Sequence, residues 1–232
     1  PPPLPAPSPP SPPPPVDPAR EAALDLLLEI EATGAPASGP MERREAALPD
    51  PRARSFFRSL VAGTLRHRGR LDHLLGGWLT GRGLEELPPA IRGALRLGAA
   101  QLLVLDGVPP HAAVHETVAL AGRHGHRGTT GLVNAVLRRA AREGRAAWEE
   151  IDRQAAPTVE SLALRYSHPE WLVRRWLARW GAERAEAVLR WDNQQPDYWV
   201  RLRPERGSGP GDAPSGSAAA PPGSVPGWVP GT

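Results

Sequence analysis

Residues 91–140 constrain the fold more than any other part of the chain, because they contain three helical patterns separated by two short breaks. In each pattern apolar residues recur at three- and four-residue intervals, as in helices that bury one face. The first break contains Gly107, which can adopt the left-handed conformation at a helix end, and Pro110, which suits the first turn of a new helix. The second break contains Gly122 and Gly125. Three amphipathic helices with short connections predict the core of a helical bundle.

Further helices are predicted on both sides of this stretch. Asp17-Pro18 and Asp50-Pro51 each pair a capping carboxylate with a proline at the first helical position, which predicts helices beginning at residues 18 and 51. We expect the first helix to end at Glu31 and residues 32–49 to form a long loop around a short polar turn, since this segment contains several prolines and glycines. Shorter helices are predicted over 71–79, 148–151, 158–166 and 169–191 (with a break at Gly181), and a strand is predicted over 198–203.

Proline and glycine are concentrated at the two ends of the 232-residue chain. Residues 1–16 are a polyproline segment, which we interpret as a disordered spacer, although its composition also suits an aromatic-lined groove. Residues 207–232 are interpreted as a Gly/Ser/Pro-rich tail that is truncated where a further segment begins. Between the two ends we expect a helical domain over 17–145 and a second region over 146–206.

Several kinds of site are not expected in this sequence. It contains no cysteine, which excludes disulfides, thiolate metal ligands and cysteine nucleophiles. Neither a serine elbow nor a glycine-rich phosphate loop after a strand is present. His111 and His115 have the spacing of two metal ligands on one helix face, but no third ligand is visible, and we interpret them as a cap and a surface residue. We therefore expect no catalytic residue, metal site or bound cofactor in this chain.

The hydropathy pattern gives no sign of a membrane protein. No apolar run approaches the ~20 residues that a membrane-spanning helix needs. No basic segment followed by an apolar one marks a signal peptide. We expect a cytoplasmic protein without membrane contact.

The positive charge is placed unevenly along the chain. Every basic residue is an arginine, which a G/C-rich genome would by itself explain, but 15 arginines face only 6 acidic residues over 52–145. A basic surface of this density is typical of proteins that bind a phosphate backbone. The tryptophans at 171, 176 and 180 raise the alternative of base stacking, but Trp176 and Trp180 repeat with an apolar stripe, and we interpret them as core residues.

We expect the nucleic-acid contacts to come from arginines near helix ends. Any one of them is also explained as a solvated residue or, at a C-terminal turn, as a partner of the helix dipole. The candidate residues for binding a nucleic acid, and RNA if the resemblance described next holds, are Arg20, Arg52, Arg66, Arg68, Arg70, Arg138 and Arg139.

Several segments resemble one known family. Residues 95–121 (LRLGAAQLLVLDGVPPHAAVHETVALA) and 131–139 (GLVNAVLRR) resemble the NusB-like RNA-binding domain, in the version found at the N-terminus of RsmB (Sun/Fmu) ribosomal RNA cytosine-5 methyltransferases. The resemblance extends to DPRARSFFRSLVAGTLRHRGRLD at 50–72, and to RYSHPEWLVRRWLARWG and NQQPDYWVRLRP within 165–204. His115 departs from the pattern, since the family has asparagine there.

The resemblance implies both a fold and a function. The fold would be all-α, a NusB-like helical bundle, followed over 146–206 by a short helical linker and the start of an α/β extension. The function would be recognition of small-subunit ribosomal RNA within such a methyltransferase. The family's S-adenosylmethionine loop and its two catalytic cysteines have no counterpart here, so this cofactor is implied only for the full-length parent.

Two other hypotheses stay open. One is that the chain resembles NusB in function, as a transcription antitermination factor that binds leader RNA with a small ribosomal protein; the segment 165–204 argues against this. The other is that the intact gene product is the methyltransferase and this chain is a truncated copy of it.

Overall fold

The computed structural model describes residues 16–153, 156–194, 199–201 and 228–230. A first unit extends to Arg190, and a second comprises residues 191–232. The helices of the described residues are α1 (Pro18–Thr33), α2 (Ser38–Ala46), α3 (Pro51–Arg66), α4 (Arg68–Trp78), the 3₁₀ turn η1 (Leu84–Glu86), α5 (Pro89–Leu103), α6 (Pro110–Gly122), α7 (Arg127–Arg153), α8 (Val159–Tyr166) and α9 (Glu170–Asp192). The all-α bundle predicted from the sequence is confirmed.

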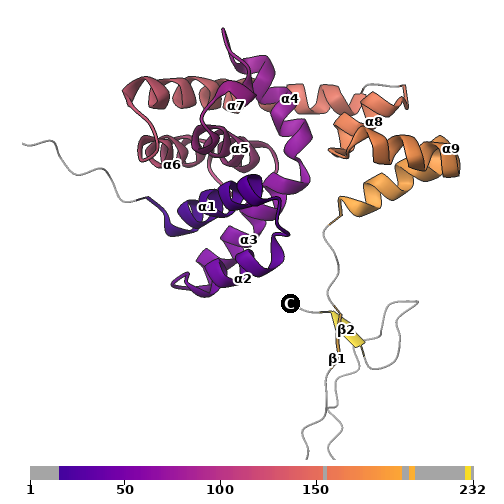
Figure 1. The fold of residues 1–232 in the computed structure, drawn as a ribbon, viewed down its shortest axis with the longest axis horizontal. Helices are drawn as coiled ribbons and strands as arrows, with labels where there is room; N and C mark the ends of the chain where they lie inside the picture. Colours follow the sequence, from indigo (N-terminus) through magenta and orange to yellow (C-terminus); the bar gives the residue numbers. More distant parts are fainter. Residues whose placement is uncertain (1–15, 154–155, 195–198, 202–227, 231–232) are drawn as a thin grey trace, which may run out of the picture. The chain divides into compact units, whose positions relative to one another are not determined.

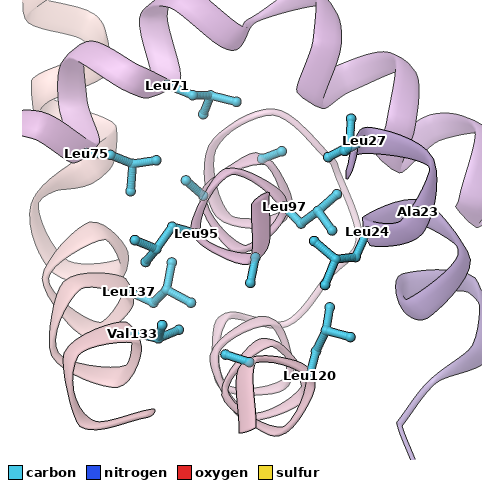
Figure 2. Close-up of a cluster of buried hydrophobic side chains, with 14 of the residues drawn as sticks. Ala23, Leu24, Leu27, Leu71, Leu75, Leu95, Leu97, Leu120, Val133 and Leu137 are labelled. Atoms are coloured by element: carbon cyan, nitrogen blue, oxygen red, sulfur yellow. The ribbon is translucent and has the colours of Figure 1, made fainter. Parts of the chain in front are cut away.

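Helix α5 is the centre of the bundle (Figure 1). Every residue from Ile91 to Gln101 is buried, because α1, α3, α4, α6 and α7 all pack against this helix. Figure 2 shows its Leu95 and Leu97 among leucines and valine from four neighbouring helices: Leu24 and Leu27 of α1, Leu71 and Leu75 of α4, Leu120 of α6, and Val133 and Leu137 of α7. A helix enclosed in this way is expected to be mostly apolar, and α5 is, apart from its buried Arg92, Arg96 and Gln101.

Glycines let two helices approach α5 closely. A Cβ at Gly98 of α5 would lie 2.6 Å from Cδ1 of Leu137 and 3.0 Å from Cγ2 of Thr117. A Cβ at Gly144 of α7 would lie 2.6 Å from Cδ2 of Leu103. Both distances of 2.6 Å join α5 to α7 and are shorter than carbon atoms tolerate, so a methyl group at either glycine would force the facing leucine to move.

The predicted helix starts are confirmed. The side chain of Asp17 accepts a hydrogen bond from the backbone N–H of Arg20, and that of Asp50 accepts one from Ala53 at 2.8 Å. Helix α6 begins at Pro110, as expected. Each cap satisfies one of the N–H groups that a helix start leaves without a partner.

The expected loop over 32–49 is wrong in part, because residues 38–46 form α2. This helix buries none of its residues, so it lacks the apolar stripe by which a helix is found in a sequence. Ion pairs with neighbouring helices hold it: Arg44 lies 2.6 Å from Glu29 of α1, and Glu45 lies 2.6 Å from Arg58 of α3.

The predicted third helix of the central stretch and the short helix over 148–151 are one continuous helix, α7. The sequence pattern weakens after residue 140, yet Trp148 and the buried Ile151 continue the same core. The expected domain boundary between residues 145 and 146 therefore lies inside a helix.

A smaller core joins α8 to α9. It consists of Leu162 and Ala163 of α8 with Val173 and Leu189 of α9, and Trp176 packs against it as expected. Trp180 was expected in the core, but it is 36% exposed and does not belong to this cluster; its ring contacts that of Trp176. At Gly181 the helix has a positive φ of 75°, which interrupts α9 at the predicted break.

The second unit contains a short antiparallel pair of strands. Strand β1 (Trp199–Arg201) pairs with β2 (Trp228–Pro230), with Val200 opposite Val229. The first lies within the strand predicted over 198–203, whose other residues fall outside the described ones. No helix in the part of the chain that the structure describes is long and apolar enough to span a membrane.

Candidate nucleic-acid interface

The arginines of this fold fall into two groups, buried ones with partners inside the protein and exposed ones that a ligand could reach. Four arginines of the described residues are buried: Arg20, Arg70, Arg92 and Arg96. A buried guanidinium needs hydrogen-bond partners inside the protein, whereas an exposed one is available to a ligand. The interface must therefore be sought among the exposed arginines.

Arg92 and Arg96 connect α5 to α1, α4 and η1. Arg96 binds Asp72 of α4 through two hydrogen bonds of 2.7 and 2.9 Å. Arg92 donates to Glu31 of α1 at 2.5 Å, and both arginines approach Glu85 of η1 at 3.3 Å. The forked geometry of guanidinium explains why arginine can bind several acceptors here.

Arg20 also has structural partners. Its Nε donates to Oε1 of Gln101 at 2.8 Å, and its guanidinium lies 4.7 Å from the centre of the Phe56 ring. It also lies 3.4 Å from Asp17. These contacts connect α1 to α3 and α5, and they leave Arg20 8% exposed.

Arg70 links the bundle to the helices that follow it. Its guanidinium donates to the carbonyl oxygens of Trp148 and Arg165 and, at 2.8 Å, to the carboxylate of Asp152. It also lies 3.8 Å from the centre of the Trp148 ring. Its backbone N–H donates to Oγ of Ser167. One side chain from α4 therefore holds α7 and α8.

His67 lies beside this link, between α3 and α4. Its ring meets the edge of Trp148 with 5.5 Å between ring centres. Its Nδ1 is buried, and no group among the described residues hydrogen-bonds to it. Burial, followed by the positive charges of Arg66 and Arg70, lowers the pKa of His67 from 6.5 to about 4.

This lowered pKa predicts a pH-dependent stability. The unfolded chain takes up the proton of His67 near pH 6.5, whereas the folded one does so only near pH 4. The stability that neutral His67 provides is therefore present above pH 6.5 and is lost as the pH falls toward 4. We expect His67→Phe, which keeps a ring against Trp148, to reduce the loss of unfolding free energy between pH 7 and pH 5 by about 1 kcal/mol. Urea denaturation at the two pH values measures this, and equal losses in both proteins would contradict it.

The other arginines predicted near the α3–α4 junction are placed differently. Arg66 is the half-buried last residue of α3, and Arg68 begins α4 and is exposed, 3.7 Å from Asp72. The sequence placed Arg66, Arg68 and Arg70 together at one helix end. The structure instead divides them between two helices and turns Arg70 inward. Arg52 lies exposed in the first turn of α3 and has no ion pair among the described residues.

Helix α7 presents a stripe of exposed arginines that includes only one predicted residue. Arg138, Arg142 and Arg145, here called the α7 stripe, are spaced four and three residues apart and all are exposed. This spacing places them on one helix face over roughly 10 Å. Arg138 donates to Asn134, and Arg142 lies 3.8 Å from Glu143. Sequence reasoning missed Arg142 and Arg145, although their spacing from Arg138 was a readable signal.

Arg139, the other predicted residue of α7, points away from this stripe. It donates to Glu143 at 2.8 Å and is half-buried. Its charge is therefore partly compensated within the helix.

The histidines considered as metal ligands are not brought together with others. The side chain of His115 is 73% exposed, and its Nδ1 lies 3.3 Å from Glu116. Within the described ranges, no three histidine or acidic side chains gather as a metal site would require.

Comparison with known proteins identifies two matching regions. The model of the NusB family matches residues 17–142, and that of the RsmF/B-like methyltransferase ferredoxin-like domain matches residues 168–209. The second match is consistent with the expected start of an extension after the bundle.

Two curated relatives match the chain over different lengths. The probable ribosomal RNA small subunit methyltransferase B of Bacillus subtilis is 34% identical over 185 residues, which cover 79% of this chain and 40% of that protein. The transcription antitermination protein NusB of Thermobifida fusca is 35% identical over 121 residues, which cover 52% of this chain and 84% of that protein. The chain thus spans about 40% of the length of the methyltransferase relative.

A solved structure agrees with the fold. The NusB structure determined with NusE and double-stranded RNA has a TM-score of 0.50 and 23% identity, and the alignment covers 54% of this chain and 95% of that one. The family model covers more than half of the chain. The protein therefore belongs to the NusB family, and in it the NusB domain is followed by a match to the ferredoxin-like domain of RsmF/B-like methyltransferases.

Proposed function

We propose that this chain is the RNA-recognition portion of an RsmB-like small-subunit ribosomal RNA cytosine-5 methyltransferase. Two findings support this: the match after the NusB region is to a domain named for RsmF/B-like methyltransferases, and the similarity to a methyltransferase relative covers 79% of the chain, more than the NusB match alone. S-adenosylmethionine is the cofactor we propose for the complete protein, and we assign no residue of this chain to it. A cytoplasmic location is part of the same proposal, since the relatives are named for ribosomal RNA modification.

The α7 stripe is the observation that carries the RNA-binding proposal. Its three guanidinium groups lie on the solvent face of a helix whose opposite face packs on α5 and α6. The packed face holds the helix in place, and the arginines on the other face are exposed where phosphates could reach them. Arginine contacts of this kind position a nucleic acid without reading its sequence. Arg52, Arg66, Arg68 and Arg139 remain proposed contacts at the rim, whereas we propose that Arg20 and Arg70 act by supporting the fold.

Removing the stripe tests the proposal. The variant Arg138→Gln/Arg142→Gln/Arg145→Gln is expected to weaken binding to a single-stranded fragment of small-subunit ribosomal RNA. It should also reduce the slope of log affinity against log salt by about 2, since each phosphate contact contributes roughly 0.7. Fluorescence anisotropy at several salt concentrations measures both quantities.

A matched variant controls for net charge. Arg43→Gln/Arg153→Gln/Arg184→Gln removes three exposed arginines of α2, the end of α7 and α9. It should leave the slope within experimental error of the unaltered protein. Equal effects of the two triple variants would show that the binding is nonspecific attraction to a basic protein, and the assignment to α7 would then fail.

A NusB-type antitermination factor, binding leader RNA together with a small ribosomal protein, is the second candidate function. The relative from Thermobifida fusca favours it, since that protein is named for antitermination. The match at residues 168–209 favours the methyltransferase instead, because it lies beyond the NusB match. A small ribosomal protein stays a proposed partner under either function, and co-purification with purified ribosomal proteins would test it.

A further inference from the structure

The first part of α9 has two unlike faces. Its inner face packs Val173, Trp176 and Leu177 against the small core shared with α8. Helical spacing places Trp171, Arg174, Arg175 and Ala178 together on the opposite face, and all four are exposed. We call this opposite face the α9 platform.

Trp171 is the feature of this platform that the fold does not explain. It is 64% exposed, although burying an indole is among the larger gains that a side chain can make. Trp180 is also exposed, but its ring packs on Trp176 with 5.9 Å between ring centres. No aromatic ring among the described residues packs on Trp171 in this way.

The neighbours of Trp171 indicate what could cover it. Arg174 and Arg175 follow it by three and four residues, so their side chains border the indole on the helix surface. Arg174 is 3.9 Å from Glu170, a long ion pair on the surface, and Arg175 has no ion pair among the described residues. A protein partner or a membrane would favour further apolar side chains around the indole, and the platform offers only Ala178. One aromatic ring bordered by cations is instead the arrangement that binds single-stranded nucleic acid.

We propose that the α9 platform binds an unpaired RNA base, which stacks on Trp171 while Arg174 and Arg175 contact the adjoining phosphates. This inference rests on the proposed function, since it names a second point of contact for the same RNA. The two contacts differ in chemistry. The α7 stripe recognises charge, whereas the platform recognises the presence of a base that is not paired.

A pair of oligonucleotides separates these contributions. We would measure the affinity of the full chain for a 12-nucleotide oligoadenosine strand and for a strand of the same length whose central bases are removed. Trp171→Leu is expected to weaken binding to the intact strand by roughly 5- to 100-fold and to leave the abasic strand unaffected. Trp171→Phe, which keeps an aromatic face, should retain most of the affinity. Since neither variant changes a charge, the salt slope should not change.

Two results would contradict base binding by the α9 platform. One is equal affinity of Trp171→Leu and the unaltered protein for the intact strand; the other is an equal loss on both strands. Thermal denaturation of each variant confirms that α9 still packs, which is expected because Trp171 is exposed. If the triple variant of the α7 stripe loses affinity for both strands while Trp171→Leu loses none, base binding by the platform is wrong and the proposed function stands. If the unaltered protein binds neither strand nor the ribosomal fragment, the proposed function itself fails.

Discussion

Replacing Arg70 with methionine is expected to lower the free energy of unfolding by about 3 kcal/mol. Methionine replaces the apolar stem of arginine but not its guanidinium, so the loss comes mainly from the hydrogen bonds to Trp148, Arg165 and Asp152 and from the contact with the Trp148 ring. Hydrogen bonds to a charged group contribute about 1.5–3 kcal/mol each. Asp152 is half-exposed, so water can replace its hydrogen bond to Arg70 and the expected loss is smaller than the sum. Denaturation with guanidinium chloride measures the loss of unfolding free energy. Amide hydrogen exchange should speed up most in α8, where the lost contacts lie.

Arg68 provides the control for this prediction. It lies two residues from Arg70 on the same helix but is exposed, with a single 3.7 Å ion pair to Asp72. Arg68→Met should change stability by less than about 0.5 kcal/mol, as surface ion pairs usually do. Similar losses in the two variants would mean that Arg70 is not a special link between helices.

The contact between Gly98 and Leu137 is expected to show strong coupling. Leu137→Ala should lower the unfolding free energy by about 3 kcal/mol, because the side chain is fully buried between α5 and α7. Gly98→Ala alone should cost about 1–2 kcal/mol: a helix gains up to about 1 kcal/mol from alanine, but the new methyl would meet Leu137 at 2.6 Å. In the double variant this new methyl would occupy space that the leucine side chain has left. The combined loss should then be smaller than the sum by about 1 kcal/mol or more.

An exposed glycine of α7 gives the matched control. A Cβ at Gly131 would meet no atom within 4 Å. Gly131→Ala should therefore stabilise the protein by up to about 1 kcal/mol and should add independently to Leu137→Ala. Denaturation of all the single and double variants completes both double-mutant cycles. Additive losses for Gly98→Ala and Leu137→Ala would contradict the close contact between these two residues.

Much of the fold could be predicted because it rests on local signals. The caps at Asp17 and Asp50 and the proline at 110 mark helix starts within the chain itself. Helix α2 could not be found in this way, since what holds it comes from Glu29 and Arg58 in other helices. The length of α7 was missed for a similar reason: Trp148 and Ile151 gain their core contacts only after the chain has folded.

The candidate interface was less predictable than the fold. Arg68 and Arg70 are two residues apart and are the same residue type, yet one is exposed and the other is 4% exposed. The hydrogen-bond partners of the Arg70 side chain lie 78 to 95 residues further along the chain, so no local pattern distinguishes the two. Counting arginines finds a basic region, but burial decides which of its members can meet a ligand.

The continuity of α7 affects how this protein unfolds. At 1.5 Å per residue its 27 residues extend about 40 Å, from the close packing on α6 to the contacts of Arg70. A chain cut after Arg145 would remove Trp148 and Ile151, and with them part of the cover over His67 and the main core. The bundle and the first helix after it should therefore melt in one cooperative transition, without a stable intermediate in which only residues 17–145 are folded.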